Sequence, residues 1–167
     1  FLNGKKPIQH RSSYGLGEVI KAALDNHTEH LVISLGGIGS FDGGAGMLQA
    51  LGARFYDDEA QIVDMRKGAD LIKYIRRIDL SGVHPQLAKV NIQLMSDFSS
   101  RLYGKKSEIM QTYESLDLSQ NEAAEIDNLI WYFSELFKNE LKIAMGPIER
   151  GGAGGGIAAV LNSLYQA

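Results

Sequence analysis

A glycine-rich segment with one aspartate is the part of the sequence best suited to chemistry. Asp42 lies between Gly36–Gly37 and Gly43–Gly44, at the turn between a short apolar run and a helix that we expect over about 45–51. Backbone N–H groups and a helix N-terminus favour an anion such as phosphate or carboxylate at such a turn. An aspartate beside that anion would serve as a Mg²⁺ ligand or as the base that takes a hydroxyl proton. The alternative is that Asp42 caps the following helix.

The turn matches neither of the common nucleotide-binding motifs. It does not end in Gly-Lys followed by Ser or Thr, and Gly37 and Gly39 have no third glycine at the dinucleotide-binding spacing. The segment 104–107, Gly-Lys-Lys-Ser, has the end of a phosphate loop without its earlier glycine, which favours a solvated turn. Any kinase activity must therefore use another architecture.

Hydrophobic periodicity predicts the elements that would position these residues. Ser119 and Glu122 form a capping box ahead of the clearest amphipathic helix, which should run to about Leu141. Two apolar runs predict buried strands, His30–Leu35 and Val90–Met95, and the second strand delivers Asp97. We also expect helices over about 16–26 and 69–77, a short strand at Arg54–Tyr56, and a final helix with Ile157, Val160, Leu161 and Leu164 on one face. This order predicts an α/β fold with a layered parallel or mixed sheet flanked by helices.

Composition limits the classes of protein to consider. A length of 167 residues suits one domain, over 1–167, and the net charge of −3 without basic clusters argues against a nucleic-acid binder. No apolar run reaches the length of a membrane span. The absence of cysteine excludes disulfides, thiolate metal sites and a cysteine nucleophile, and favours the cytoplasm. The chain starts at Phe1 without a signal peptide and resembles an interior fragment.

Several segments then resemble one family in the same order along the chain. The segment 34–53, SLGGIGSFDGGAGMLQALGA, resembles the signature loop of the bacterial glycerate kinases of the two-domain, glycerate 2-kinase type. The segments 12–20, SSYGLGEVI, and 78–87, IDLSGVHPQL, are similar to further stretches of that family. Ser96-Asp97 stands where the family has Cys-Asp, and 151–161 resembles its closing glycine motif. The chain is identified as a divergent member that covers the central, inserted domain.

This resemblance implies a fold, an activity and a site. It implies transfer of a phosphate from ATP, with Mg²⁺, to a hydroxyl of D-glycerate, in a cleft between this domain and a flavodoxin-like domain that is largely absent here. We therefore expect the fragment alone to be inactive. By position, Asp42 and Asp97 would be catalytic and would also be possible Mg²⁺ ligands. The substrate- or phosphate-binding residues would be Gly36, Gly37, Ser40, Gly43, Gly44, Gly152, Gly154 and Gly155.

The chain also departs from the family pattern. Where the family has Ser-Ala-Thr-Asn before its aspartate, this chain has Ile38 to Phe41, and the segment 99–118 keeps only Leu102 and Gly104 convincingly. These departures leave open a non-catalytic binding or regulatory module, or a kinase for a different hydroxy acid or sugar acid. On the long helix, Trp131 to Phe133 would serve in core packing or on the face of a homodimer.

Overall fold

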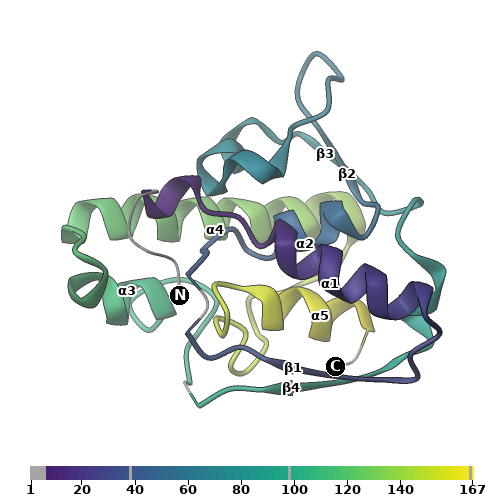
Figure 1. The fold of residues 1–167 in the computed structure, drawn as a ribbon. Coiled ribbons are helices and arrows are strands. Elements are labelled where there is room, and N and C mark those ends of the chain that lie inside the picture. Colours follow the sequence, from purple (N-terminus) through teal and green to yellow (C-terminus); the bar gives the residue numbers. More distant parts are fainter. Residues whose placement is uncertain (1–6, 38, 98, 166) are drawn as a thin grey trace.

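The computed structural model describes residues 7–37, 39–97, 99–165 and 167. Figure 1 shows two small sheets and a set of helices. The α-helices are α1 (Tyr14–Asp25), α2 (Ala45–Ala50), α3 (Glu108–Thr112), α4 (Gln120–Leu141) and α5 (Ile157–Tyr165). The strands are β1 (His30–Ser34), β2 (Arg54–Tyr56), β3 (Arg77–Asp79) and β4 (Asn91–Met95). Short 3₁₀ helices are η1 (Ile8–His10), η2 (Met65–Lys67), η3 (Ala69–Tyr74), η4 (Pro85–Ala88) and η5 (Tyr113–Leu116). The mixed α/β architecture with a parallel strand pair and flanking helices is confirmed.

The parallel pair β1–β4 forms one layer of the molecule. His30 pairs with Asn91 and Ser34 with Met95, and the pairing continues where the Leu35 N–H donates to the Met95 carbonyl at 2.8 Å. In Figure 1 the two strands run along the bottom of the molecule, and all the labelled helices lie above these strands. The prediction that both strands are buried was wrong, because Val32 is 60% and Met95 51% exposed. An apolar run predicts a strand, but it does not reveal whether both faces of that strand are covered.

The second sheet pairs the expected strand β2 with β3, a strand that the sequence analysis did not predict. Strand β2 is confirmed, and it pairs antiparallel with β3, where Phe55 lies opposite Ile78. The helix expected over 69–77 is instead the 3₁₀ helix η3, followed by an extended Ile75. Its buried residues, Ala69 and Ile72, and the buried Ile75 that follows it recur every third position, which is the period of a 3₁₀ helix. The α-helical interpretation of this segment was therefore wrong.

Helix α4 is the longest helix and confirms the prediction at both ends. Ser119 accepts from the Glu122 backbone, and the Glu122 carboxylate accepts from the Ser119 backbone. Its buried face includes Phe133, whose ring meets Phe55 at 5.8 Å and Phe137 at 4.9 Å between centroids. Phe133 thus serves in the core, whereas Trp131 is exposed and the homodimer face stays a prediction. Within the described residues, no helix combines the length and the hydropathy that crossing a membrane requires.

The capping box of α4 gives a first stability prediction. Ser119→Ala removes the acceptor for the Glu122 N–H and is expected to lower the free energy of unfolding by about 1 kcal/mol. Urea denaturation followed by circular dichroism measures this change. Ser115→Ala is the control, because Ser115 is exposed and its hydroxyl donates to the Thr112 carbonyl without capping a helix. Equal effects of the two substitutions would show that the cap contributes nothing specific.

Candidate functional site

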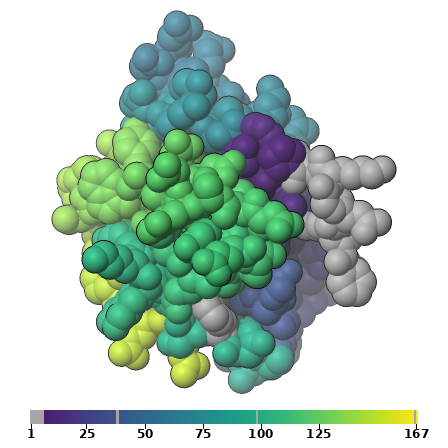
Figure 2. Space-filling model, turned by 90° about the vertical axis from the view of Figure 1, so that its left-hand side faces the viewer, coloured from purple at the N-terminus to yellow at the C-terminus, as the bar shows by residue number. Residues whose placement is uncertain are grey.

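The carboxyl ends of β1 and β4 bring together one group of the predicted residues. Because parallel strands end at the same edge of a sheet, the loops after them are neighbours. A Cβ placed on Gly36 would lie 3.4 Å from Asp97 Oδ1, and Gly36, Gly37 and Asp97 are all exposed. In Figure 2, which faces these strand ends, the segments after β1 (blue) and β4 (teal) lie close together at the lower edge. Asp97 and the first two glycines therefore share one surface region.

Glu108, which the sequence analysis did not select, lies in the same region. Its Oε2 accepts from the Gly155 N–H at 3.1 Å, so the first residue of α3 reaches the closing glycine turn. Burial raises the pKa of Glu108, the backbone N–H groups of Gly155 and Gly154 lower it, and the nearby Asp97 raises it. No local motif marks Glu108, because its partner lies 47 residues away in the chain. The structure thus adds a second carboxylate beside Asp97.

The raised pKa of Glu108 has a consequence for stability. Between the ordinary pKa of glutamate and the raised folded-state value, the folded protein binds a proton that the unfolded protein has released. Stability therefore falls as pH rises through that window. Glu108→Gln should remove this fall, so that the variant gains stability relative to the parent between acid and neutral pH. Thermal melts from pH 4 upward measure it, and the exposed Glu125→Gln controls for the loss of a surface charge. Parallel profiles for parent and Glu108→Gln would contradict the prediction.

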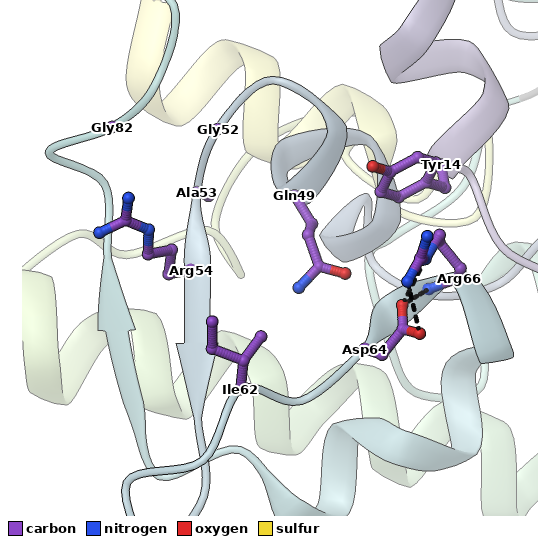
Figure 3. A pocket seen from close by; sticks show the side chains of 9 residues that line it. All are labelled: Tyr14, Gln49, Gly52, Ala53, Arg54, Ile62, Asp64, Arg66 and Gly82. Carbon is purple, nitrogen blue, oxygen red and sulfur yellow. Dashed lines mark hydrogen bonds and ion pairs between the residues drawn. The ribbon is translucent and has the colours of Figure 1, made fainter.

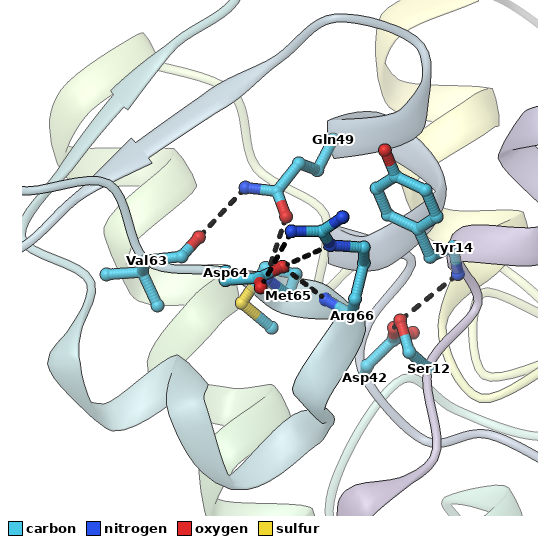
Figure 4. Close-up of polar contacts among 8 residues, drawn as sticks. All are labelled: Ser12, Tyr14, Asp42, Gln49, Val63, Asp64, Met65 and Arg66. Atoms are coloured by element: carbon cyan, nitrogen blue, oxygen red, sulfur yellow. Dashed lines mark hydrogen bonds and ion pairs between the residues drawn. The ribbon is translucent and has the colours of Figure 1, made fainter.

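Asp42 is placed inside the protein and holds two helices. Its side chain is 0% exposed. Oδ2 accepts from the Ser13 N–H at 2.8 Å, the Ser13 hydroxyl at 2.9 Å and the Gly46 N–H at 3.2 Å, while Oδ1 accepts from the Gly44 N–H at 3.1 Å. Oδ2 also accepts from the Ser12 hydroxyl, and Figure 4 shows Ser12 beside Asp42. Burial raises the pKa of Asp42, against the lowering effect of these hydrogen bonds.

These contacts favour the helix-capping alternative for Asp42, and its catalytic and metal-binding role stays a prediction. Ser13 is the residue before α1, and Gly44 and Gly46 lie at the start of α2. The carboxylate therefore holds the N-termini of α1 and α2 together. This agrees with the helix-capping alternative, except that two helices are involved and not one. The side chain has no exposed surface and both its oxygens accept hydrogen bonds from the protein, so binding a substrate or a Mg²⁺ ion would require these contacts to rearrange.

The remaining predicted binding residues pack against each other. Unlike Gly36 and Gly37, they are buried: Ser40, Gly43, Gly44, Gly152, Gly154 and Gly155. The Gly43 N–H donates to the Gly155 carbonyl at 3.0 Å, and a Cβ on Gly155 would lie 2.0 Å from the Ser40 carbonyl oxygen. These glycines allow two loops to approach closely. The substrate-binding role expected for this buried set stays a prediction.

A separate cavity lies between α1, α2, β2 and the segment that leads into η2 (Figure 3). Its volume is about 420 Å³, and no predicted site residue lines it. The Arg66 Nε donates to Asp64 at 2.8 Å, and Gln49 bonds the backbone on both sides, to the Val63 carbonyl and the Met65 N–H. Because these polar groups already satisfy one another, we assign no chemistry to this cavity.

The described residues contain no group of three or more His, Cys, Asp or Glu that would share a metal ion. Asp97 and Glu108 are two carboxylates in one region, and Mg²⁺ in phosphoryl-transfer sites commonly uses one or two carboxylates together with substrate phosphates. A metal role for Asp97 therefore stays a prediction that the local geometry allows.

Comparison with known proteins agrees with this architecture. The model of the glycerate kinase family matches residues 2–167. The glycerate kinase of Halalkalibacterium halodurans is 31% identical over 156 residues, which cover 93% of this chain and 40% of that protein. The glycerate 2-kinase of Escherichia coli K12 has the same identity and coverage.

A solved structure adds the match in three dimensions. It belongs to a Salmonella typhimurium LT2 protein assigned as glycerate kinase 2, and it superposes with a TM-score of 0.91 at 29% identity, covering 99% of this chain and 44% of that one. The chain thus spans about two fifths of the length of the curated relatives named above. The family match over nearly all its residues shows that the chain belongs to the glycerate kinase family.

Proposed function

We propose that this protein takes part in the ATP-dependent phosphorylation of D-glycerate as one domain of a larger two-domain enzyme. The observation that carries the proposal is the exposed carboxylate of Asp97 at the carboxyl edge of β1–β4, beside Gly36 and next to Glu108. In this role Asp97 accepts the proton of the substrate hydroxyl or contacts Mg²⁺. The backbone of Gly36 and Gly37 is exposed in the same place for a carboxylate or phosphate.

The carboxylates of Asp97 and Glu108 are donors that suit Mg²⁺ when it is bound together with the phosphates of a nucleotide such as ATP. Asp97 and Glu108 would hold the ion, which would supply positive charge to neutralise the phosphates during transfer. Oε2 of Glu108 already accepts a hydrogen bond from the Gly155 N–H. The chain's own contribution is to position these two carboxylates from the end of β4 and the start of α3.

The chain by itself is expected to be inactive. It spans 40% of the curated relatives, and a site in a cleft between two domains needs groups from both. The proposal includes a small-molecule substrate, a cytoplasmic location, and no nucleic-acid or membrane partner. Measurable phosphorylation of D-glycerate by residues 1–167 alone would contradict the expectation that the active site needs groups from both domains.

Asp97→Asn tests the proposal in the full-length protein that contains this chain. A coupled assay of ADP release with D-glycerate should show kcat reduced about 10²- to 10⁴-fold if Asp97 handles the proton. Asp117→Asn is the matched control, because Asp117 is exposed and has a positive φ that asparagine also adopts. Activity of Asp97→Asn within a few-fold of the parent, with intact folding, would remove Asp97 from the site.

Two observations favour a second function, a non-catalytic binding or regulatory module. The Glu108 carboxylate already accepts hydrogen bonds from backbone N–H groups of the closing glycine turn. Phe41 is buried at a position where the family has a polar residue. A folded full-length protein that D-glycerate stabilises against heat but that shows no turnover would support this module over the kinase.

A further inference from the structure

A basic pocket lies at the base of the closing glycine turn and is separate from the cavity in Figure 3. We use the name "basic pocket" for the hollow of about 420 Å³ that is lined by Ser99, Ser100, Arg101, Lys106, Glu149 and Arg150. These residues come from the loop after β4 and from the turn before α5. None of them is among the residues that the family resemblance selected.

Backbone hydrogen bonds hold the walls of the basic pocket in place. The Arg101 N–H donates to the Lys106 carbonyl at 2.9 Å, and the Gly152 N–H donates to the Ser100 carbonyl at 3.2 Å. Asp127 on α4 accepts from the Gly104 N–H with both oxygens, at 2.8 and 3.0 Å, which fixes the turn that carries Lys106. The two walls are therefore tied to each other and to the longest helix.

The charges of the basic pocket do not cancel. Three of its side chains, Arg101, Lys106 and Arg150, are cationic, and Glu149 is the one acid among the lining residues. Across the described part of the chain, none of the three cations has an ion-pair partner. This contrasts with the cavity in Figure 3, where Arg66 is paired with Asp64. A net positive hollow attracts a multiply charged anion.

Ser100 supplies the second, independent indication of a ligand. It is only 4% exposed, and its hydroxyl has no hydrogen-bond partner among the residues that the structure describes. Its Oγ is so close to Gly152 that a Cβ there would lie 2.5 Å away, so the hydroxyl is held in a confined position. A buried hydroxyl without a partner is unfavourable. An oxygen-rich ligand in the pocket would accept its hydrogen bond.

We propose that the basic pocket binds a phosphate group of a ligand. The Ser100 hydroxyl donates to one phosphate oxygen, and Arg101, Lys106 and Arg150 neutralise the charge. Phosphate suits this pocket better than a carboxylate, because it carries more charge and has more acceptor oxygens for cationic donors to share. The proposal rests on the pocket itself and does not depend on the phosphorylation of glycerate.

Isothermal titration of the protein with pyrophosphate at constant ionic strength tests the proposal. Lys106→Gln and Arg150→Gln should each raise the Kd about tenfold, the effect of one lost charge-assisted contact. Lys105→Gln is the matched control, since Lys105 is the adjacent exposed lysine and does not line the pocket. It should change the Kd less than about twofold if binding depends on position rather than on total charge. Equal weakening by Lys105→Gln and Lys106→Gln would reduce the proposal to nonspecific attraction and overturn it.

Ser100→Ala separates a binding role from a structural one. It should weaken pyrophosphate binding several-fold while the melting temperature of the free protein stays the same or rises, because an unpaired buried hydroxyl is removed. A lowered melting temperature with unchanged affinity would contradict the proposal.

Titrations with ATP and with glycerol 3-phosphate then distinguish the source of the phosphate. Preference for ATP assigns the pocket to a polyphosphate tail, and preference for glycerol 3-phosphate assigns it to a phosphomonoester. Absence of binding by the folded protein to all three probes overturns the inference.

Discussion

Asp42→Ala is expected to destabilise the protein by about 4 kcal/mol or more, because it leaves several buried donors without an acceptor. The Ser13, Gly44 and Gly46 N–H groups and the Ser13 hydroxyl all donate to this carboxylate. The Ser13 hydroxyl also accepts from the Met47 N–H at 2.9 Å, so the loss would spread to α2. Urea unfolding monitored by circular dichroism measures the change.

Asp42→Asn distinguishes the structural role of Asp42 from a catalytic one. An amide keeps the shape of the side chain but turns an NH₂ group toward backbone donors on one side. We therefore expect a loss of stability between that of the parent and that of Asp42→Ala. A variant as stable as the parent that loses only activity would support the catalytic role predicted for Asp42.

Gly155→Ala is expected to cost about 3–5 kcal/mol, from backbone strain together with overpacking. Gly155 has a φ of +63°, and a Cβ there would lie 2.0 Å from the Ser40 carbonyl oxygen and 2.9 Å from the Phe41 Cα. Because both neighbours are backbone atoms, no side-chain rotation relieves the contact. Thermal and urea unfolding of the purified variant give the magnitude.

Gly104→Ala isolates the strain from the contact. Gly104 has a φ of +87° with no atom within 4 Å of the added Cβ, so its replacement should cost only about 1–2 kcal/mol. If Gly155→Ala costs no more than this control, the two loops are not held at the distance that the structure gives. If Gly155→Ala instead folds normally and loses ligand binding, the substrate-binding role that the family resemblance implies for Gly155 would be supported.

Local patterns predicted most of the elements well. The capping box placed α4 with both its ends, since Ser119 and Glu122 satisfy each other within one turn. The apolar run at 90–95 predicted β4, and Arg54–Tyr56 is a strand as expected. The same method was wrong about η3 and the burial of the strands. The type of helix at η3 depends on the spacing of the residues that pack into the core. The burial of a strand depends on which elements cover each of its faces. An apolar run in the sequence reveals neither.

The sequence by itself determined the family and the order of the main elements, because several motifs recur in one order and each motif acts through nearby backbone. Only the tertiary structure decided where the carboxylates lie and which groups they contact. Asp42 meets Ser13 across 29 residues, and Glu108 meets Gly155 across 47. Such contacts between residues far apart in the chain set the exposure of a carboxylate, its hydrogen-bond partners and the charged groups near it. They make Asp42 a helix anchor and leave Asp97 at the surface, although both aspartates follow an apolar strand in the sequence.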